Sequence, residues 1–126
     1  MQETRINLYS KIFIELLTDL SNLYPNDSSL SLFKLTVSGM VALGAKSFVF
    51  QVIEYLEPYS EQILKKDEHF FMGGLEEEFS SDPFISGEIK RIKDIWVNPD
   101  TTDNTKACIW KYFQNLVKLG KGIRRT

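Results

Sequence analysis

Apolar side chains recur every three or four positions along the first quarter of the chain, which is the spacing of one face of an α-helix. The apolar positions of this face are Tyr9, Ile12, Phe13, Leu16, Leu17, Leu20 and Leu23. The run Tyr24–Asp27 is typical of a turn, because proline disfavours a helical residue before it and Asn and Asp bond their own backbone. The pattern predicts a first helix that ends before this turn, with Asp27, Ser28 or Ser29 as the cap of the next.

A second helix is predicted from the apolar face formed by Leu30, Phe33, Val37, Met40 and Val41. Lys34 is its only charged residue, which favours a helix packed on more than one side. Gly44 offers a left-handed exit. A third helix follows, with the apolar positions Phe48, Val49, Val52, Ile53 and Leu56.

Pro58 must end, kink or restart the helix that precedes it, since proline lacks the amide hydrogen and clashes with the preceding turn. Its simplest role is as the first residue of a fourth helix. That helix is expected to reach about Lys66 and to bury Tyr59 and Ile63. Residues 67–84 then lose regular spacing, and the segment is predicted to be an irregular acidic and aromatic loop.

Two further helices are predicted after this loop. The fifth points Ile85, Ile89, Ile92 and Trp96 inward and Glu88, Lys90, Arg91 and Lys93 outward. Thr102 or Asp103 should cap the sixth. Its apolar positions are Ile109, Tyr112, Phe113, Leu116 and Val117, widened by Trp110 and Cys108.

Strand alternation does not extend over enough residues to build a sheet. The expected fold class is therefore all-α, a compact bundle of five or six helices. At 126 residues the chain suits a single domain, residues 1–126, with a short basic tail at residues 120–126.

Composition favours an intracellular setting. Cys108 is the one cysteine and has no internal disulfide partner. The start of the chain lacks the basic, apolar and small-residue regions of a secretory signal. The longest uncharged stretch, Leu35 to Ala45, is much shorter than the roughly 20 apolar residues of a membrane span. We therefore expect no membrane partner.

Charge is unevenly distributed. Residues 104–126 hold six basic residues and no acidic one, so residues 1–103, with nine basic and 17 acidic residues, carry a net charge of −8. The basic end supports one functional alternative, a nucleic-acid-associated protein. Its phosphate-contacting residues would be Lys118, Lys121, Arg124 and Arg125.

No residue pattern amounts to a catalytic signature. His69 is the one histidine, and a hydrolase or transferase would have to pair it with a carboxylate such as Glu68 or with a distant nucleophile. One cysteine and one histidine are too few for an ordinary structural zinc site. We expect no catalytic, metal-binding or cofactor-binding residues and no cofactor.

The aromatic and acidic loop carries the leading functional hypothesis. Its candidate partner-binding residues are Phe70, Phe71, Glu76, Glu77, Glu78 and Phe79. They either cover the open end of the bundle or dock a partner with a basic surface. Docking predicts a non-enzymatic module that binds another protein. A second copy of the chain is a further candidate partner, since the wide apolar last helix would complete its core in a dimer.

Four segments carry a resemblance to a known family: Ile63–Phe71, Ile95–Trp96, Ile109–Leu116 and Asp19–Asn26. The chain resembles small helical proteins of large nucleocytoplasmic DNA viruses of algae and protists. In these proteins a Phe-Phe segment precedes an Ile-Trp-Lys-Tyr-x-Gln helix. The resemblance implies a viral protein of the host cytoplasm, virus factory or virion, and it implies no catalytic residue.

Overall fold

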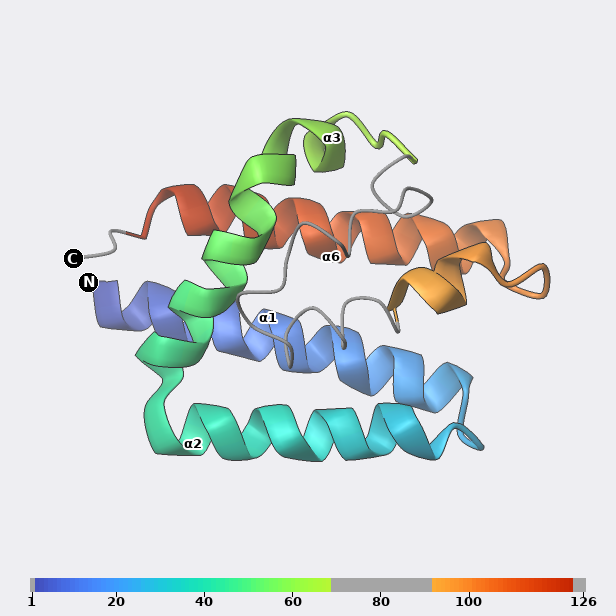
Figure 1. Ribbon diagram of the computed structural model, residues 1–126, viewed down its shortest axis with the longest axis horizontal. Coiled ribbons are helices and arrows are strands. Elements are labelled where there is room, and N and C mark those ends of the chain that lie inside the picture. Colours follow the sequence, from blue (N-terminus) through green and yellow to red (C-terminus); the bar gives the residue numbers. More distant parts are fainter. Residues whose placement is uncertain (1, 69–91, 124–126) are drawn as a thin grey trace.

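The computed structural model describes residues 2–68 and 92–123 (Figure 1). Helix α1 (Gln2–Leu23) buries the predicted face from Tyr9 to Leu20 and leaves Leu23 exposed, because the helix ends there. The turn forms as predicted, with the Asp27 amide donating to the Tyr24 carbonyl at 3.0 Å. Asp27 also caps the next helix, since its Oδ1 accepts from the Leu30 amide at 3.3 Å.

The second and third predicted helices are the two halves of one element, α2 (Ser28–Leu56), which bends at Gly44. Gly44 has φ −179° and ψ 85°, an extended conformation. The predicted left-handed exit is therefore wrong. One extended residue is enough to change the direction of the helix axis, so no loop separates the two halves of α2. The second half therefore crosses back over the molecule.

Pro58 is the second residue of the 3₁₀ helix η1 (Glu57–Tyr59), one position after the helix start that was predicted for it, and η1 leads into α3 (Ser60–Leu64). Helix α3 ends two residues earlier than expected. The side chain of Gln114 explains how this short helix is held, because its Nε2 donates to the carbonyls of Ile63 and Leu64 at 3.3 and 3.2 Å.

Residues 92–97 are helical, and α6 (Asp103–Lys121) follows after a short connection. Ile92 and Trp96 are buried as predicted, and the Trp96 and Trp110 rings meet edge to face with centroids 5.0 Å apart. Lys93 was predicted to face solvent, but only 4% of it is exposed. The helical spacing did not reveal this burial, because it depends on contacts with residues far away in the sequence.

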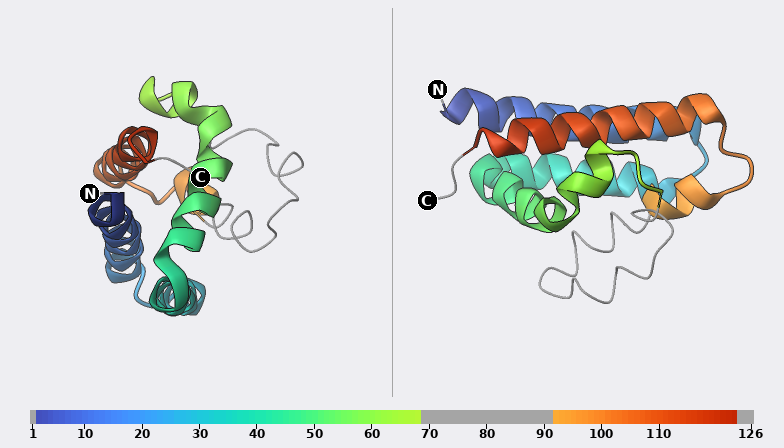
Figure 2. Two further views of the ribbon diagram at one scale, coloured as in Figure 1. Left: turned by 90° about the vertical axis from the view of Figure 1, so that its left-hand side faces the viewer. Right: turned by 90° about the horizontal axis from the view of Figure 1, so that it is seen from above.

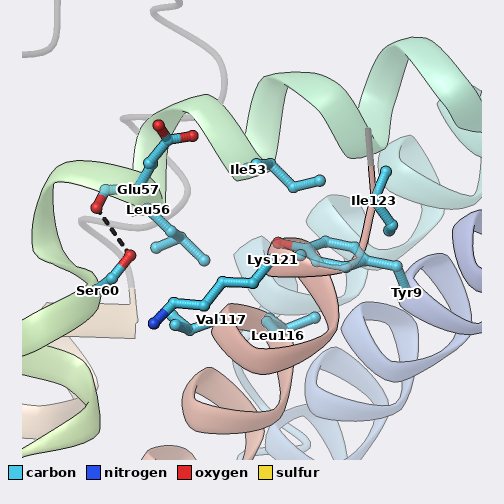
Figure 3. A pocket seen from close by; sticks show the side chains of 10 residues that line it. Tyr9, Ile53, Leu56, Glu57, Ser60, Leu116, Val117, Lys121 and Ile123 are labelled. Carbon is cyan, nitrogen blue, oxygen red and sulfur yellow. Dashed lines mark hydrogen bonds between the residues drawn. The ribbon is translucent and has the colours of Figure 1, made fainter. Parts of the chain in front are cut away.

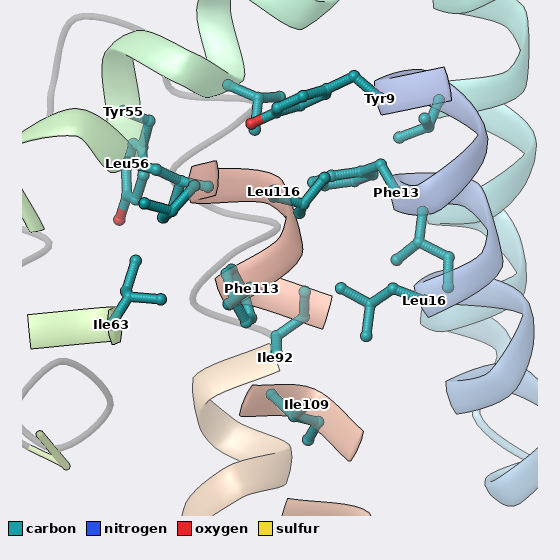
Figure 4. Packing of buried hydrophobic residues seen from close by; sticks show 14 of the residues in the cluster. Tyr9, Phe13, Leu16, Tyr55, Leu56, Ile63, Ile92, Ile109, Phe113 and Leu116 are labelled. Atoms are coloured by element: carbon teal, nitrogen blue, oxygen red, sulfur yellow. The ribbon is translucent and has the colours of Figure 1, made fainter. Parts of the chain in front are cut away.

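Helix α1 lies between the first half of α2 and α6, and the second half of α2 crosses beside them toward α3 (Figures 1 and 2). Buried side chains from α1, α2, α3, residues 92–97 and α6 meet in one core (Figure 4). The all-α prediction is confirmed for the described residues, where no strand occurs. The number of helices depends also on residues 69–91, which lie outside them.

Candidate functional site

The sequence-predicted site residues fall into two groups. Phe70, Phe71, Glu76, Glu77, Glu78 and Phe79, together with Arg124 and Arg125, lie outside the described residues. Lys118 and Lys121 are exposed in the last turn of α6. There the fold adds a third cation, because Arg5 Nη1 donates to the Gly122 carbonyl at 2.8 Å. Cations at a helix C-terminus are also stabilised by the helix dipole.

A different surface stands out in the described structure, on the outer side of the first half of α2. We call it the α2 stripe; it consists of Leu32, Leu35, Gly39, Ala42 and Leu43. These positions are three or four residues apart and so follow one face of the helix. Leu32, Leu35 and Leu43 are 64, 70 and 93% exposed. Three large apolar side chains on one helix face form a contiguous surface rather than isolated exposures.

The opposite face of the same helix explains why the stripe is free. Leu30, Phe33 and Val37 are buried against α1, and the Phe33 ring meets the Phe13 ring edge to face at 6.1 Å. The prediction that this helix is packed on more than one side is wrong for the described chain. A helix that is covered on one side and carries a second apolar face on the other gains free energy when that second face is also covered.

By length and composition alone, residues Leu30–Leu64 are long and apolar enough to cross a membrane, with a mean hydropathy of 1.4. The sequence prediction found no span because it considered only the uncharged stretch. Of the most apolar part of this segment, 28% is already buried inside the protein, and the core helix of a globular protein can be equally long and apolar. The bend at Gly44 also divides this segment into two helices of different direction.

A groove with a cavity volume of about 330 Å³ runs between the C-terminal part of α1 and the N-terminal part of α6. Its lining includes Leu16, Leu20, Cys108 and Tyr112. Cys108 was predicted to lie inside the apolar face, but it is exposed. Burial and the hydrogen bond that Tyr112 donates to the Asp19 carboxylate raise the pKa of Tyr112.

The described residues offer little for metal or acid–base chemistry. They contain no group of three or more His, Cys, Asp or Glu side chains that could hold a metal ion. A nucleophile–base pair would need the exposed thiol of Cys108 beside a base, and His69 lies outside the described part of the chain. The candidate surface with the clearest physical rationale is therefore the α2 stripe.

Comparison with protein families, with curated proteins and with solved structures found no match for this chain.

Proposed function

We propose that this protein is a non-enzymatic helical module that binds another protein chain through the α2 stripe, and that its partner there is a second copy of itself. The observation that carries the proposal is the exposure of Leu32, Leu35 and Leu43 on the face of α2 opposite to its buried side. Such a helix is stable when both of its sides are covered.

The spacing of the stripe supports a second copy as the occupant. Leu35 and Leu43 stand four residues on either side of Gly39. Two α2 helices that cross antiparallel at Gly39 therefore bring Leu35 of each copy against Leu43 of the other. A twofold interface has this property, because the same surface patch must complement itself.

Gly39 suits the crossing point. A Cβ built at Gly39 meets no atom within 4 Å, so the glycine leaves an open notch in the outer face of α2. A partner backbone can approach closely at a residue without a side chain. Within the first half of α2 the single charge, Lys34, is off the stripe, and no like charges oppose each other there.

The free energy available is moderate. Burying one fully exposed leucine side chain contributes roughly 1.5–3 kcal/mol. The three leucines of each copy are 64–93% exposed, so together the two copies contribute about 7–14 kcal/mol. Association costs about 4–15 kcal/mol in lost translational and rotational freedom. Because this gain and this cost are of similar size, the expected pairing is weak and depends on protein concentration.

The test is sedimentation velocity over a concentration series, with wild type, Leu35→Glu and Leu8→Glu. The wild-type mass should rise from 14.6 kDa toward twice that value. Leu35→Glu should remain at the monomer mass, since a carboxylate at the centre of the interface would be buried without a partner. Leu8 is the matched control, because it is 46% exposed on α1 and off the stripe. Equal helical circular dichroism shows that all three proteins are folded.

Three results would count against the proposal. A wild-type protein that stays monomeric at the highest concentration would exclude self-pairing. A Leu8→Glu variant that dissociates as Leu35→Glu does would show that the stripe is not the interface. Co-flotation of monomeric wild type with lipid vesicles, lost in Leu35→Glu, would assign the stripe to a membrane surface instead.

The other expectations from the sequence stay predictions. The docking role of Phe70, Phe71 and residues 76–79 concerns residues outside the described chain. The nucleic-acid alternative has Lys118 and Lys121 in the described part of α6, and the helix dipole already accounts for cations at this position. A location in an infected cell or a virion, which the resemblance to viral proteins implies, likewise stays a prediction.

A further inference from the structure

A second feature, separate from the α2 stripe, is a pocket of about 360 Å³ between the first turns of α1, the second half of α2 and the end of α6 (Figure 3). Its walls are mostly aliphatic and include Ile53, Leu56, Leu116, Val117 and Ile123. A cavity of this size falls within the range of sites that bind small organic molecules.

Tyr9 places a polar atom in this apolar pocket. The residue is 0% exposed, and its hydroxyl oxygen has no hydrogen-bond partner within the described structure. Figure 3 shows the hydroxyl end of the ring directed into the pocket, away from α1. Burial raises the pKa of Tyr9, so the phenol stays protonated and has a hydrogen to donate. A buried hydroxyl without a partner is rare in native proteins and calls for an explanation.

Gly120 shapes the wall beside this ring. A Cβ built at Gly120 would lie 3.3 Å from Ile53 Cγ1, which is closer than most real Cβ contacts. It would also lie 3.5 Å from Tyr9 Cε2. The glycine therefore lets α6 approach Tyr9 and Ile53 while keeping the pocket open between them.

Lys121 supplies a positive charge at the mouth of the same pocket. Its side chain is exposed and lines the cavity, and no ion pair to it is formed within the described residues. Two other polar residues contribute less. Ser60 Oγ donates to the Glu57 carbonyl at 2.8 Å, and the Glu57 carboxylate points away from Tyr9 in Figure 3.

From this arrangement we propose that the pocket binds a small amphipathic monocarboxylate, such as a medium-chain fatty acid. The alkyl chain covers the aliphatic walls formed by Ile53, Leu56 and Val117. The Tyr9 hydroxyl donates to one carboxylate oxygen once the side chains that cover it move aside. The exposed Lys121 side chain, whose ammonium lies toward Ser60 in Figure 3, turns toward the ligand and balances its negative charge. A single cation and a single neutral donor suit a monoanion better than a multiply charged phosphate.

The experiment is isothermal titration calorimetry with decanoate, kept below its micelle concentration, and with 1-decanol as the uncharged comparison. Four proteins are compared: wild type, Tyr9→Phe, Lys121→Gln and Lys118→Gln. Lys118 is the matched control, since it is an exposed lysine one turn earlier on α6 that does not line the pocket.

Wild type should bind one decanoate saturably. Tyr9→Phe and Lys121→Gln should each weaken decanoate binding about 5–10-fold, the effect of losing one hydrogen bond or one partly exposed charge contact. Lys118→Gln should bind as wild type does. Decanol binding should fall in Tyr9→Phe and stay unchanged in Lys121→Gln.

The proposal is overturned if wild type shows no saturable heat, which would mean that solvent alone fills the pocket. It is also overturned if Lys118→Gln loses as much affinity as Lys121→Gln, or if Tyr9→Phe binds decanoate as tightly as wild type. Thermal unfolding of each variant verifies that a loss of binding is not a loss of fold.

Discussion

Tyr9 and Tyr24 both carry a hydroxyl at the edge of the core, and the two hydroxyls differ in their contacts. Tyr9 Oη has no partner in the described structure, whereas Tyr24 Oη lies 3.2 Å from Thr101 Oγ1. A buried donor without a partner keeps its full desolvation penalty, while a bonded hydroxyl contributes a net stabilisation of about 0.5–1.5 kcal/mol. The same substitution should therefore act in opposite directions at the two positions.

We expect Tyr9→Phe to leave the free energy of unfolding unchanged or to raise it by about 1 kcal/mol, because it removes only the unpaired hydroxyl. Tyr24→Phe should lower it by about 0.5–1.5 kcal/mol. Urea denaturation in the absence of any fatty acid measures both values, and equal m-values verify that the unfolded states are comparable. A larger loss in Tyr9→Phe than in Tyr24→Phe would show that the Tyr9 hydroxyl is bonded.

Helix α6 depends on a cap at its first turn. Thr102 Oγ1 accepts from the Thr105 amide at 3.2 Å, which satisfies one of the amides that a helix start leaves without a partner. Thr102→Ala should therefore lower the free energy of unfolding by about 1 kcal/mol. Thr102→Ser is the control, since it keeps the hydroxyl and should retain most of the stability. Guanidinium denaturation of the three proteins checks this, and an equal loss in Ser and Ala would contradict it.

The starts of the helices could be predicted because they depend on local chemistry. Asp27 and Thr102 act as caps within three residues of the amides that they accept from. Pro58 lies in the first turn of η1, where the proline ring is tolerated, although η1 begins one residue earlier than predicted. The direction of the chain at Gly44 was not predictable in this way. A glycine permits many conformations, and distant contacts select among them.

The candidate sites were harder to predict because they depend on which faces the tertiary structure covers. The apolar positions of α2 were recognised, but periodicity does not reveal that Leu35 and Leu43 stay exposed. Cys108 and Lys93 were each assigned to the wrong environment for the same reason. Likewise, a tyrosine at position 9 is an ordinary core residue in the sequence, and only its neighbours show that its hydroxyl lacks a partner.

The bend in α2 organises the whole molecule, because it lets one helix pack on α1 twice. The Phe13 ring of α1 meets Phe33 of the first half at 6.1 Å and Phe48 of the second half at 5.3 Å, edge to face in both cases. All three rings are buried. Phe13 thus fixes the two halves of α2 relative to each other, and aromatic pairs of this geometry add about 0.5–1.5 kcal/mol beyond burial.

If this cluster sets the bend, the glycine at the bend should matter little. Gly44 has an extended conformation that other residues adopt, and a Cβ built on it meets nothing within 4 Å. We expect Gly44→Ala to change the free energy of unfolding by less than about 1 kcal/mol. Phe13→Ala should lower it by about 3–5 kcal/mol, because it removes the ring that both halves contact.

Urea denaturation followed by circular dichroism gives both free energies. Compared with glycine, alanine at position 44 favours a straight helix by about 1 kcal/mol. A straight α2 would separate Phe48 from Phe13, and the packing energy lost in this way is larger than that local preference. A loss in Gly44→Ala as large as that in Phe13→Ala would mean that the backbone of Gly44, rather than the aromatic cluster, determines the path of α2. A free energy of unfolding that is almost unchanged in Gly44→Ala would mean that the bend is caused by core contacts between residues far apart in the sequence.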